Sequence, residues 1–330
     1  MRRTTIKDVA REAGVSISTV SNALNHVGVI SEKTRAHVME VAERMHYVPN
    51  SNGQNLRAQE KKVIGMFLHE LSGPYYGELV DRMHRECQRL GYELYIFIVN
   101  SDETILQKTM SGEVCAAVLF CHVEEKTLHR LNNAGFPVAL LNYDYTDEHI
   151  CSVPFNSFHA GETAGNYLIG LNHKRLMHVR GLEDNFDTVY REAGLRSAME
   201  KAGLQLEEDY CIQGQFSRGV AYQSMKDFLR SGKPLPDAIF AANDRSAFGC
   251  IEALREEGVC VPEDVSIIGC DDIDICELYT PALTTIRTNF EKQGEIAIRE
   301  LLNLLTGKSK GQVHEIDCQL VIRKSCAARI

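Results

Sequence analysis

The chain has 330 residues, of which 44% are hydrophobic and 7% aromatic, so it is long enough for two or more domains with large cores. Its apolar runs fall short of the roughly 18 residues of a membrane span, and its charged start lacks the apolar core of an export signal, so we expect a cytoplasmic protein with no membrane partner. Eleven cysteines without a C-x-x-C pair indicate reduced thiols.

The net charge of −9 is unevenly divided along the chain. Residues 1–62 hold ten Lys and Arg against six Asp and Glu, whereas the remainder holds 26 against 39. The first segment is therefore mildly basic, which suits salt-dependent attraction to phosphates. The acidic remainder discourages indiscriminate coating of nucleic acid.

Residues 5–25 have the pattern of two short helices joined by a glycine turn. Apolar residues recur at helical spacing after Thr5, a capping residue with Asp8 three positions on. Gly14 suits the left-handed turn that ends a helix, and Ser16 suits the cap of the next one. This is the layout of a helix-turn-helix, and a third helix is expected to follow. An ordinary three-helix domain with a solvated face is the alternative.

From residue 62 onward, short apolar runs alternate with helical segments, which predicts parallel sheets covered on both faces. The runs form two series, so we expect two lobes of similar plan. The expected strands are Val63–Leu68, Leu94–Val99, Ala116–Phe120 and Val138–Leu141 in the first series, and Leu176–Val179, Ile239–Ala242 and Val265–Ile268 in the second.

Polar residues follow several of these strands, at the edge where parallel sheets bind ligands. Asn142, Asn243 and Asp271 come after strands and are candidate ligand contacts, although each could instead cap the next helix or close a turn. For Asp244 and Asp272, capping of the next helix or closing of a turn is an equally good explanation.

Signatures of catalysis, nucleotide-cofactor binding and metal binding are missing from the sequence. Neither H-E-x-x-H, G-x-S-x-G nor a strand-associated G-x-G-x-x-G occurs, so we expect no enzyme activity and no cofactor. Cys115, Cys121 and His122 could be imagined as metal ligands. The run from Cys115 to Phe120 is better explained as a buried strand, and no metal site is expected.

The chain resembles the LacI/GalR family of bacterial transcriptional regulators over essentially its whole length. The similarity is carried by IKDVAREAGVSISTVSNALN and ISEKTRAHVMEVAERMHYVPN near the start, and by AIFAANDRSAFGCIEALREEGVCVPEDVSIIGCDDI and YTPALTTIRTN in the body. The resemblance implies an α/β protein with a three-helix helix-turn-helix head (1–49), a hinge (50–61) and a two-lobed core like that of periplasmic binding proteins (62–330). Lobe one would comprise about 62–156 and 288–317, and lobe two about 157–287 and 318–330, with crossings near Phe155–Ser157, Thr285–Asn289 and Asp317–Leu320.

The resemblance also implies which residues contact operator DNA. Ile17, Ser18 and Asn22 correspond to the base-reading positions. The positions that mostly hold phosphates, which orient the head but carry little sequence information, are Thr5, Ser16, Thr19, Ser21, Asn25, Ser31 and Thr34. Asn22 stands where many family members have Arg, and Ile17 where a polar or aromatic residue is usual. We therefore expect a half-site shifted toward A·T pairs.

The segment from Asn50 to Ala58 corresponds to the hinge helix, in which Leu56 would wedge into the minor groove at the centre of the palindrome. A flexible linker is the alternative explanation of this polar stretch. Gly53 and Gln54 stand where the family usually has Ala and Arg, so we expect a hinge that orders less readily. Two subunits would read a double-stranded palindromic operator as a homodimer.

The same resemblance implies an effector site in the cleft between the lobes. Its contacts by position are Tyr75 or Tyr76, Asn142, Arg191, Phe216, Asn243, Asp271 and Phe290, although Phe216 could instead belong to the core. Arg191 and Asp271 suit a sugar, because they bind hydroxyls while an aromatic ring covers the apolar face.

Other controlling partners stay open at this point. A nucleobase is the alternative small molecule, whereas a multiply charged phosphate ester is disfavoured by the single obvious basic residue. A third alternative is a global regulator that responds to a phosphocarrier protein. The sequence does not decide whether the effector releases the operator or promotes its binding.

Overall fold

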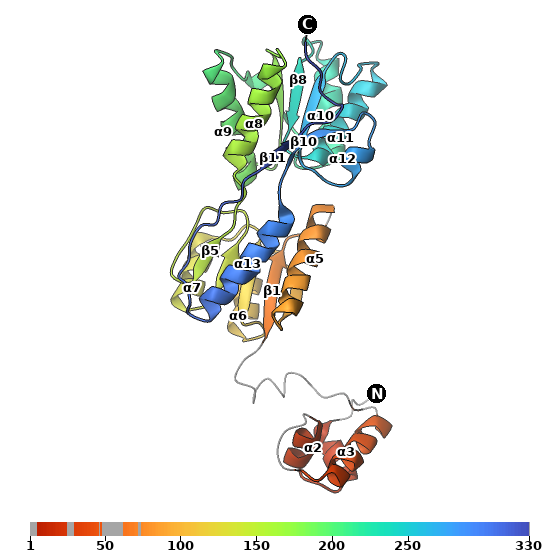
Figure 1. The fold of residues 1–330 in the computed structure, drawn as a ribbon, viewed down its shortest axis with the longest axis vertical. Coiled ribbons are helices and arrows are strands. Elements are labelled where there is room, and N and C mark those ends of the chain that lie inside the picture. Colours follow the sequence, from red (N-terminus) through yellow and green to blue (C-terminus); the bar gives the residue numbers. More distant parts are fainter. Residues whose placement is uncertain (1–4, 25–29, 46, 48–61, 72–73, 330) are drawn as a thin grey trace. The chain divides into compact units, whose positions relative to one another are not determined.

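The structure, a computed structural model, describes residues 5–24, 30–45, 47, 62–71 and 74–329, apart from the side chains of residues 74 and 75. The chain divides into two compact units, residues 1–61 and residues 62–330 (Figure 1). The predicted DNA contacts Asn25 and Leu56 and the expected hinge 50–61 lie outside the described residues.

The head consists of three helices: α1 (Ile6–Glu12), α2 (Ile17–Leu24) and α3 (Glu32–Arg44). The backbone N–H of Thr5 donates to the Asp8 carboxylate at 3.0 Å, and the hydroxyl of Ser16 accepts from the N–H of Thr19 at 3.1 Å. Gly14 has φ +66°, where a side chain would be strained. The apolar core of the head includes Val9, Ala10, Val20, Ala23, Val38 and Val41. The helix-turn-helix predicted from the sequence is present.

Lobe one contains a five-stranded parallel sheet with the order β2-β1-β3-β4-β5. Its strands are β1 (Val63–Leu68), β2 (Glu93–Ile98), β3 (Ala116–Phe120), β4 (Val138–Leu140) and β5 (Ile150–Ser152). Helices α5 (Pro74–Arg89) and α13 (Phe290–Leu305) share one apolar core with the sheet, and α6 (Asp102–Met110) and α7 (Glu125–Asn133) share another. The late helix α13 therefore completes a lobe that is otherwise built from the first half of the chain.

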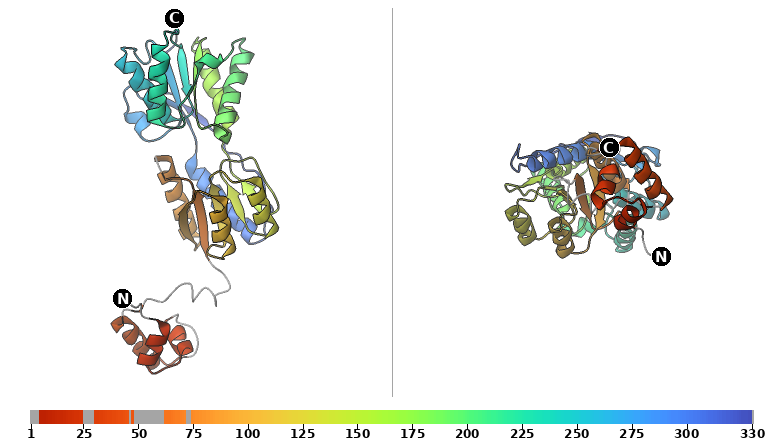
Figure 2. Two further views of the ribbon diagram at one scale, coloured as in Figure 1. Left: turned by 180° about the vertical axis from the view of Figure 1, so that it is seen from behind. Right: turned by 90° about the horizontal axis from the view of Figure 1, so that it is seen from below.

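Lobe two contains a six-stranded sheet with the order β11-β10-β9-β8-β6-β7, parallel except for β11. Its strands are β6 (Leu176–Arg180), β7 (Cys211–Gln213), β8 (Ala238–Ala241), β9 (Ser266–Asp271), β10 (Thr284–Arg287) and β11 (Gln319–Val321). Its helices are α8 (Ser157–Gly170), α9 (Phe186–Lys201), α10 (Arg218–Arg230), α11 (Asp244–Glu256), the short α12 (Ile275–Leu278) and the 3-10 turn η1 (Glu208–Tyr210). Figure 2 shows the helices on both faces of each sheet.

Three segments pass between the lobes, and we call them the crossover segments: 153–157, 287–290 and 315–318. Two of them pair with each other. The N–H of Asn156 donates to the carbonyl of Ile316 at 2.9 Å, and the N–H of Ile316 donates to the carbonyl of Pro154 at 3.0 Å. These bonds hold the first and third segments together where the chain changes lobe.

The seven predicted strands are all present, with ends shifted by up to three residues. Four strands were not predicted: β5, β7, β10 and β11, each three or four residues long. They lack the apolar runs that signal a buried strand, and β10 overlaps the segment Thr285–Asn289 that the resemblance implied as a crossing. Among the helices described, none is long and apolar enough to cross a membrane.

Candidate DNA-binding and effector sites

Helix α2 turns its apolar residues inward and leaves the predicted base-reading residues accessible. Val20 and Ala23 are buried, whereas Ile17 is 45% exposed and Ser18 is also exposed. Asn22 is half-buried one turn further on. The surface of α2 therefore offers an aliphatic side chain, a hydroxyl and an amide, which suit a thymine methyl and the edge of adenine.

The hydroxyls that the sequence assigns to phosphate contacts have partners within the head. The Ser16 hydroxyl oxygen lies 2.7 Å from that of Ser18 and 2.8 Å from that of Thr19. The Ser31 hydroxyl accepts from the N–H of Thr34 at 3.1 Å and caps α3. These bonds fix the hydroxyls at the starts of α2 and α3. Of the other predicted phosphate contacts that are described, Thr5 is exposed and Ser21 is half-buried.

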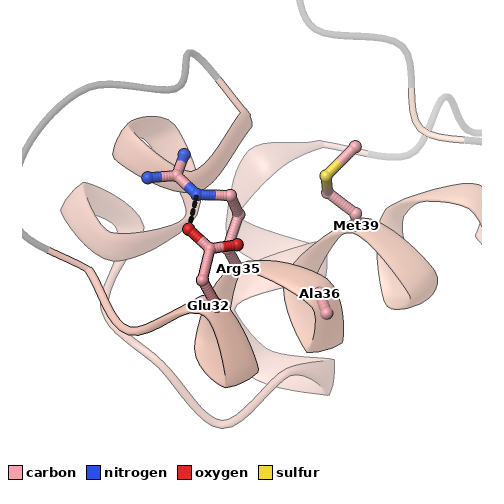
Figure 3. A pocket seen from close by; sticks show the side chains of 4 residues that line it. All are labelled: Glu32, Arg35, Ala36 and Met39. Atoms are coloured by element: carbon pink, nitrogen blue, oxygen red, sulfur yellow. Dashed lines mark ion pairs between the residues drawn. The ribbon is translucent and has the colours of Figure 1, made fainter.

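Arg35 fastens α3 to the end of α2. Its Nη1 donates to the carbonyl of Ala23 at 3.1 Å, and its Nε lies 3.9 Å from the Glu32 carboxylate. Together with Ala36 and Met39, these residues line a shallow hollow on α3 (Figure 3). The guanidinium is engaged in holding two helices together, so we assign the hollow to the packing of the head.

A buried ion pair lies in the first half of α9 in lobe two. Arg191 is 4% exposed, its Nη1 donates to the carbonyl of Ala242 at 2.6 Å, and its Nη2 lies 3.7 Å from the Asp187 carboxylate. That carboxylate also accepts from the Ser157 hydroxyl at 2.6 Å. The Nε of Arg191 has no hydrogen-bond partner among the described residues. The guanidinium therefore keeps a donor that a ligand could use.

Asp271 brings a second carboxylate to Arg191 from the end of β9. Its backbone has φ +121°, and the next residue, Asp272, has φ +62°. Such conformations cost a residue other than glycine about 1–3 kcal/mol and are typical of functional sites. Burial raises the pKa of the Asp271 carboxyl well above its usual value, while the nearby Arg191 lowers it and Asp187 raises it. Two carboxyl groups and one guanidinium thus form a polar cluster, and their role as ligand contacts stays a prediction.

Phe216 is held beside this region by an unusual loop. Gln215 and Phe216 have φ +50° and +54°, and a Cβ on Gly181 would overlap the Phe216 ring. Asn243 donates its side-chain N–H to the Phe216 carbonyl at 3.2 Å and accepts from the N–H of Ser246 at 2.9 Å. Asn243 therefore caps α11 and positions the Phe216 loop, which is the structural role that competed with a direct ligand contact.

Asp244 has protein partners for its carboxylate. It accepts from the Thr285 hydroxyl at 2.6 Å and from the N–H of Ile273 at 3.0 Å. Burial raises the pKa of Asp244 to about 6, although these hydrogen bonds lower it. These contacts join the start of α11 to β10 and to the segment after β9, while Asn243 and not Asp244 caps the helix.

Asp272 is held by two arginines. Its carboxylate lies 2.7 Å from the Nε of Arg287 and 2.7 Å from the Nη2 of Arg323. The pairing fixes the turn after β9 and leaves Asp271 as the carboxylate beside Arg191.

Lobe one contributes Tyr76, whose ring packs against Phe120 with centroids 5.4 Å apart. Burial raises the pKa of Tyr76 to about 12, with smaller effects from Glu70, Arg245 and Asp271. Because Arg245 and Asp271 belong to lobe two, Tyr76 lies where the two lobes face each other. The side chain of Tyr75 lies outside the described residues.

Asn142 and Phe290 occupy different surroundings in lobe one. The side-chain oxygen of Asn142 is buried without a hydrogen-bond partner among the described residues. Phe290 is 5% exposed and packs edge-on against Phe155, with ring centroids 5.7 Å apart. Asn142 can therefore accept from a ligand, whereas Phe290 belongs to the core of lobe one.

Sequence reasoning missed Asp187 and Ser157. The signal for Asp187 was its position four residues before Arg191, because residues at that spacing share one face of a helix. Ser157 had no comparable signal, because its bond to Asp187 joins α8 to α9 across 30 residues of sequence.

One further group of polar side chains has the spacing of metal ligands. Oxygen and sulfur atoms of Glu192, Glu208 and Cys211 lie within 4.8 Å of one another. Arg180 pairs with both carboxylates, at 2.6 Å from Glu192 and 2.5 Å from Glu208. The arginine neutralises the carboxylates that a cation would need, so we assign no metal to this group.

These features define a class: a DNA-binding head of the helix-turn-helix type in one chain with a two-lobed α/β unit that has a polar cluster at its strand ends. Residues 5–50 match the family of bacterial regulatory proteins, lacI family, and residues 166–326 match the periplasmic binding protein-like domain. The protein belongs to the lacI family of bacterial regulatory proteins.

Similar proteins support both the family and the fold. The chain is 32% identical to the HTH-type transcriptional repressor PurR of Pasteurella multocida over 99% of each chain, and 33% identical to that of Haemophilus influenzae, covering 97% of this chain and 98% of the relative. Among solved structures, the lac repressor bound to ONPG in the repressed state matches with a TM-score of 0.82 at 25% identity, covering 98% of this chain and all of the other. The complex of the transcriptional regulator CelR with cellobiose matches with a TM-score of 0.74 at 25% identity over the same shares. The family and the fold class predicted from the sequence are confirmed.

Proposed function

We propose that the protein is a homodimeric transcriptional repressor, without enzyme activity, whose affinity for a palindromic operator is set by a small effector bound between lobes one and two. Residues 1–49 would read a half-site and residues 50–61 would form the hinge. The accessible face of α2 and the polar cluster in residues 62–330 support the two halves of this proposal.

A sugar is the effector that the polar cluster suits best. The observation that carries this choice is the cluster of Asp187, Arg191 and Asp271, in which two carboxylates flank one guanidinium with an unused N–H. Carboxylates accept hydrogen bonds from hydroxyls, and a guanidinium donates to ring or hydroxyl oxygens. Phe216 and Tyr76 supply aromatic surface for the apolar face of the ring.

A nucleobase is the second candidate. Aromatic rings also stack on a flat base, and the Asn142 oxygen and the two carboxylates can accept from the N–H groups of a base. The chain is more than 30% identical to repressors named PurR, and this similarity supports the nucleobase as a candidate.

The proposed dimer would use an exposed apolar strand in lobe one. β2 is an edge strand of its sheet, and Tyr95, Ile96 and Ile98 on it are all exposed. Leu278, at the end of α12 in lobe two, is 81% exposed. Apolar side chains at these positions are liabilities in a monomer and are typical of surfaces that a second copy covers.

The test begins with selection of bound sequences from a random pool of duplex DNA by the purified protein. We expect an enriched palindrome with A·T pairs at the positions read by Ile17 and Asn22. Titration of the protein–operator complex with D-ribose, cellobiose, adenine or guanine, or with a phosphorylated carrier protein, would then identify the class of controlling partner. A response to a sugar supports the first choice, and a response to a base alone or to the carrier alone replaces it. Failure to enrich any sequence, both with the protein alone and with each of these ligands or the carrier protein present, would contradict the proposal.

A further inference from the structure

The hydrogen bond between Ser157 and Asp187 joins the proposed effector site to a crossover segment. Ser157 is 2% exposed and Asp187 is 8% exposed, so the bond is shielded from water. At 2.6 Å, a hydroxyl that donates to a carboxylate makes a short, charge-assisted bond. A carboxylate can accept about four hydrogen bonds, so Asp187 can hold Ser157 and a ligand at the same time.

Ser157 directly follows the residue at which two crossover segments meet. Besides its backbone bond to Ile316, Asn156 donates its side-chain N–H to the Glu315 carboxylate at 2.7 Å, and its carbonyl lies 3.8 Å from the thiol of Cys318. Asn156 therefore fixes the first segment to the third. Any rotation of one lobe against the other must change the backbone within a few residues of Ser157.

The hydroxyl of Ser157 is not needed to begin α8. The side chain of Asn156 accepts from the N–H of His159 at 2.8 Å and is the cap of that helix. Ser157 occupies the first helical position, where its hydroxyl is not needed to cap the helix. Among the described residues its hydroxyl bonds to Asp187, so the bond serves the connection between α8 and α9.

The second carboxylate of the site is tied to another crossover segment. The backbone N–H and the hydroxyl of Thr288 lie 3.4 and 3.5 Å from the carbonyl of Asp271. These longer contacts are weaker than the Ser157 bond, so they make the lesser connection. Both carboxylate residues beside Arg191 are nevertheless linked to segments on which the lobes turn.

We propose that Ser157 is the positioning residue through which occupancy of the effector site controls the crossover segments. The inference rests on the proposed function for the role of Asp187 as a ligand contact. A ligand that binds Asp187 would bond to the same carboxylate that holds Ser157. The resulting shift of Ser157 would then move Asn156 and the paired segment 315–318. The bond is thus a mechanical link between the ligand and the lobe rotation.

Amide hydrogen exchange on the full-length protein, followed by mass spectrometry, tests this link without DNA or effector. In Ser157→Ala, peptides that contain the N–H groups of Asn156 and Ile316 should exchange on the order of tenfold faster. In the wild type, local opening of these segments must break the hydrogen bond between Ser157 and Asp187, and in the variant that cost is gone. Asp187→Ala should give the same acceleration, and the double variant should add nothing to either single change. Peptides from α11 should exchange at the wild-type rate in all three proteins.

Thr163→Ala is the matched control, because it removes another hydroxyl of α8, one that lies 3.4 Å from His159 on the same helix. It should leave exchange of the crossover segments unchanged. The proposal is overturned by unchanged exchange at Asn156 and Ile316 in Ser157→Ala, by additive effects in the double variant, or by acceleration that spreads equally to α11. None of these outcomes depends on the operator or the effector, so they leave the DNA selection described above as a separate test.

Discussion

At the scale of single residues, His178 shows how strongly the interior of lobe two disfavours charge. It is fully buried on β6, stacks on Phe240 with ring centroids 5.3 Å apart, and has its Nδ1 3.0 Å from the Phe240 carbonyl. Burial lowers the pKa of His178 to about 4, against the attraction of Glu192. His178 therefore stabilises the core of lobe two only in its neutral form.

This shift predicts a loss of stability in acid. In the unfolded chain the pKa of His178 is about 6.5, so the unfolded state takes up a proton first as the pH falls. The stability associated with neutral His178 is complete above pH 6.5 and is lost as the pH falls toward 4, by about 2 kcal/mol between pH 7.5 and 5. Chemical denaturation at both pH values should show this drop in the wild type and a drop smaller by that amount in His178→Phe. Equal drops in the two proteins would contradict the assignment, and exposed His159→Gln serves as the control.

At the scale of elements, the crossing of α8 and α9 is set by two glycines. A Cβ on Gly161 would overlap the carbonyl oxygen of Arg191, and a Cβ on Gly194 would overlap that of Phe158. The helices approach backbone to backbone, and this approach brings Ser157 within reach of Asp187. The proposed effector site therefore depends on a packing distance that only glycine permits.

Gly161→Ala should separate these helices and lower the free energy of unfolding by about 1–3 kcal/mol, the usual cost of overpacking. Gly170→Ala, near the end of the same helix, meets no atom within 4 Å and should instead be neutral or raise stability by about 0.5–1 kcal/mol. Urea denaturation of both variants measures the contrast. Similar stabilities for the two would show that α9 can move away without cost.

Helix α2 allows a prediction about DNA sequence preference. Arg pairs with the O6 and N7 atoms of guanine, whereas Asn pairs with the N6 and N7 atoms of adenine, with about 1–3 kcal/mol of discrimination. Asn22→Arg should therefore replace A·T by G·C at one position of each selected half-site. Asn22→Ala should lose the preference for A·T without gaining one for G·C. An unchanged base preference in Asn22→Arg would remove Asn22 from the base-reading residues.

The elements that sequence could predict are those whose residues repeat with a local period. The three head helices and seven strands carry an apolar pattern, so their positions follow from it. The strand β10 and the bond from Ser157 to Asp187 depend on partners distant in sequence, and no local period reveals them. Phe290 was assigned to the ligand by position, yet it starts a helix whose apolar face turns it into the core of lobe one.

At the scale of the whole molecule, the proposed dimer would cover an exposed apolar edge of lobe one. β2 pairs only with β1 among the described strands, and its residues Tyr95, Ile96 and Ile98 are 45%, 39% and 51% exposed. An unpaired row of backbone groups with apolar side chains favours association with another copy. A palindromic operator would then be bound by two heads, each of which alone makes half of the contacts.

Ile98→Glu places a charge at the end of this edge strand and should break the dimer, because an unpaired carboxylate is costly to bury. Sedimentation should change from twice the 37.0 kDa mass of one chain to that single mass. Operator affinity should fall by at least about tenfold, since the second half-site is no longer held by the same complex. Met110→Glu, at an exposed apolar residue on α6, should change neither quantity. Ile98→Glu that remains dimeric would show that β2 lies outside the interface, and the exposed Leu278 in lobe two would then be the surface to substitute next.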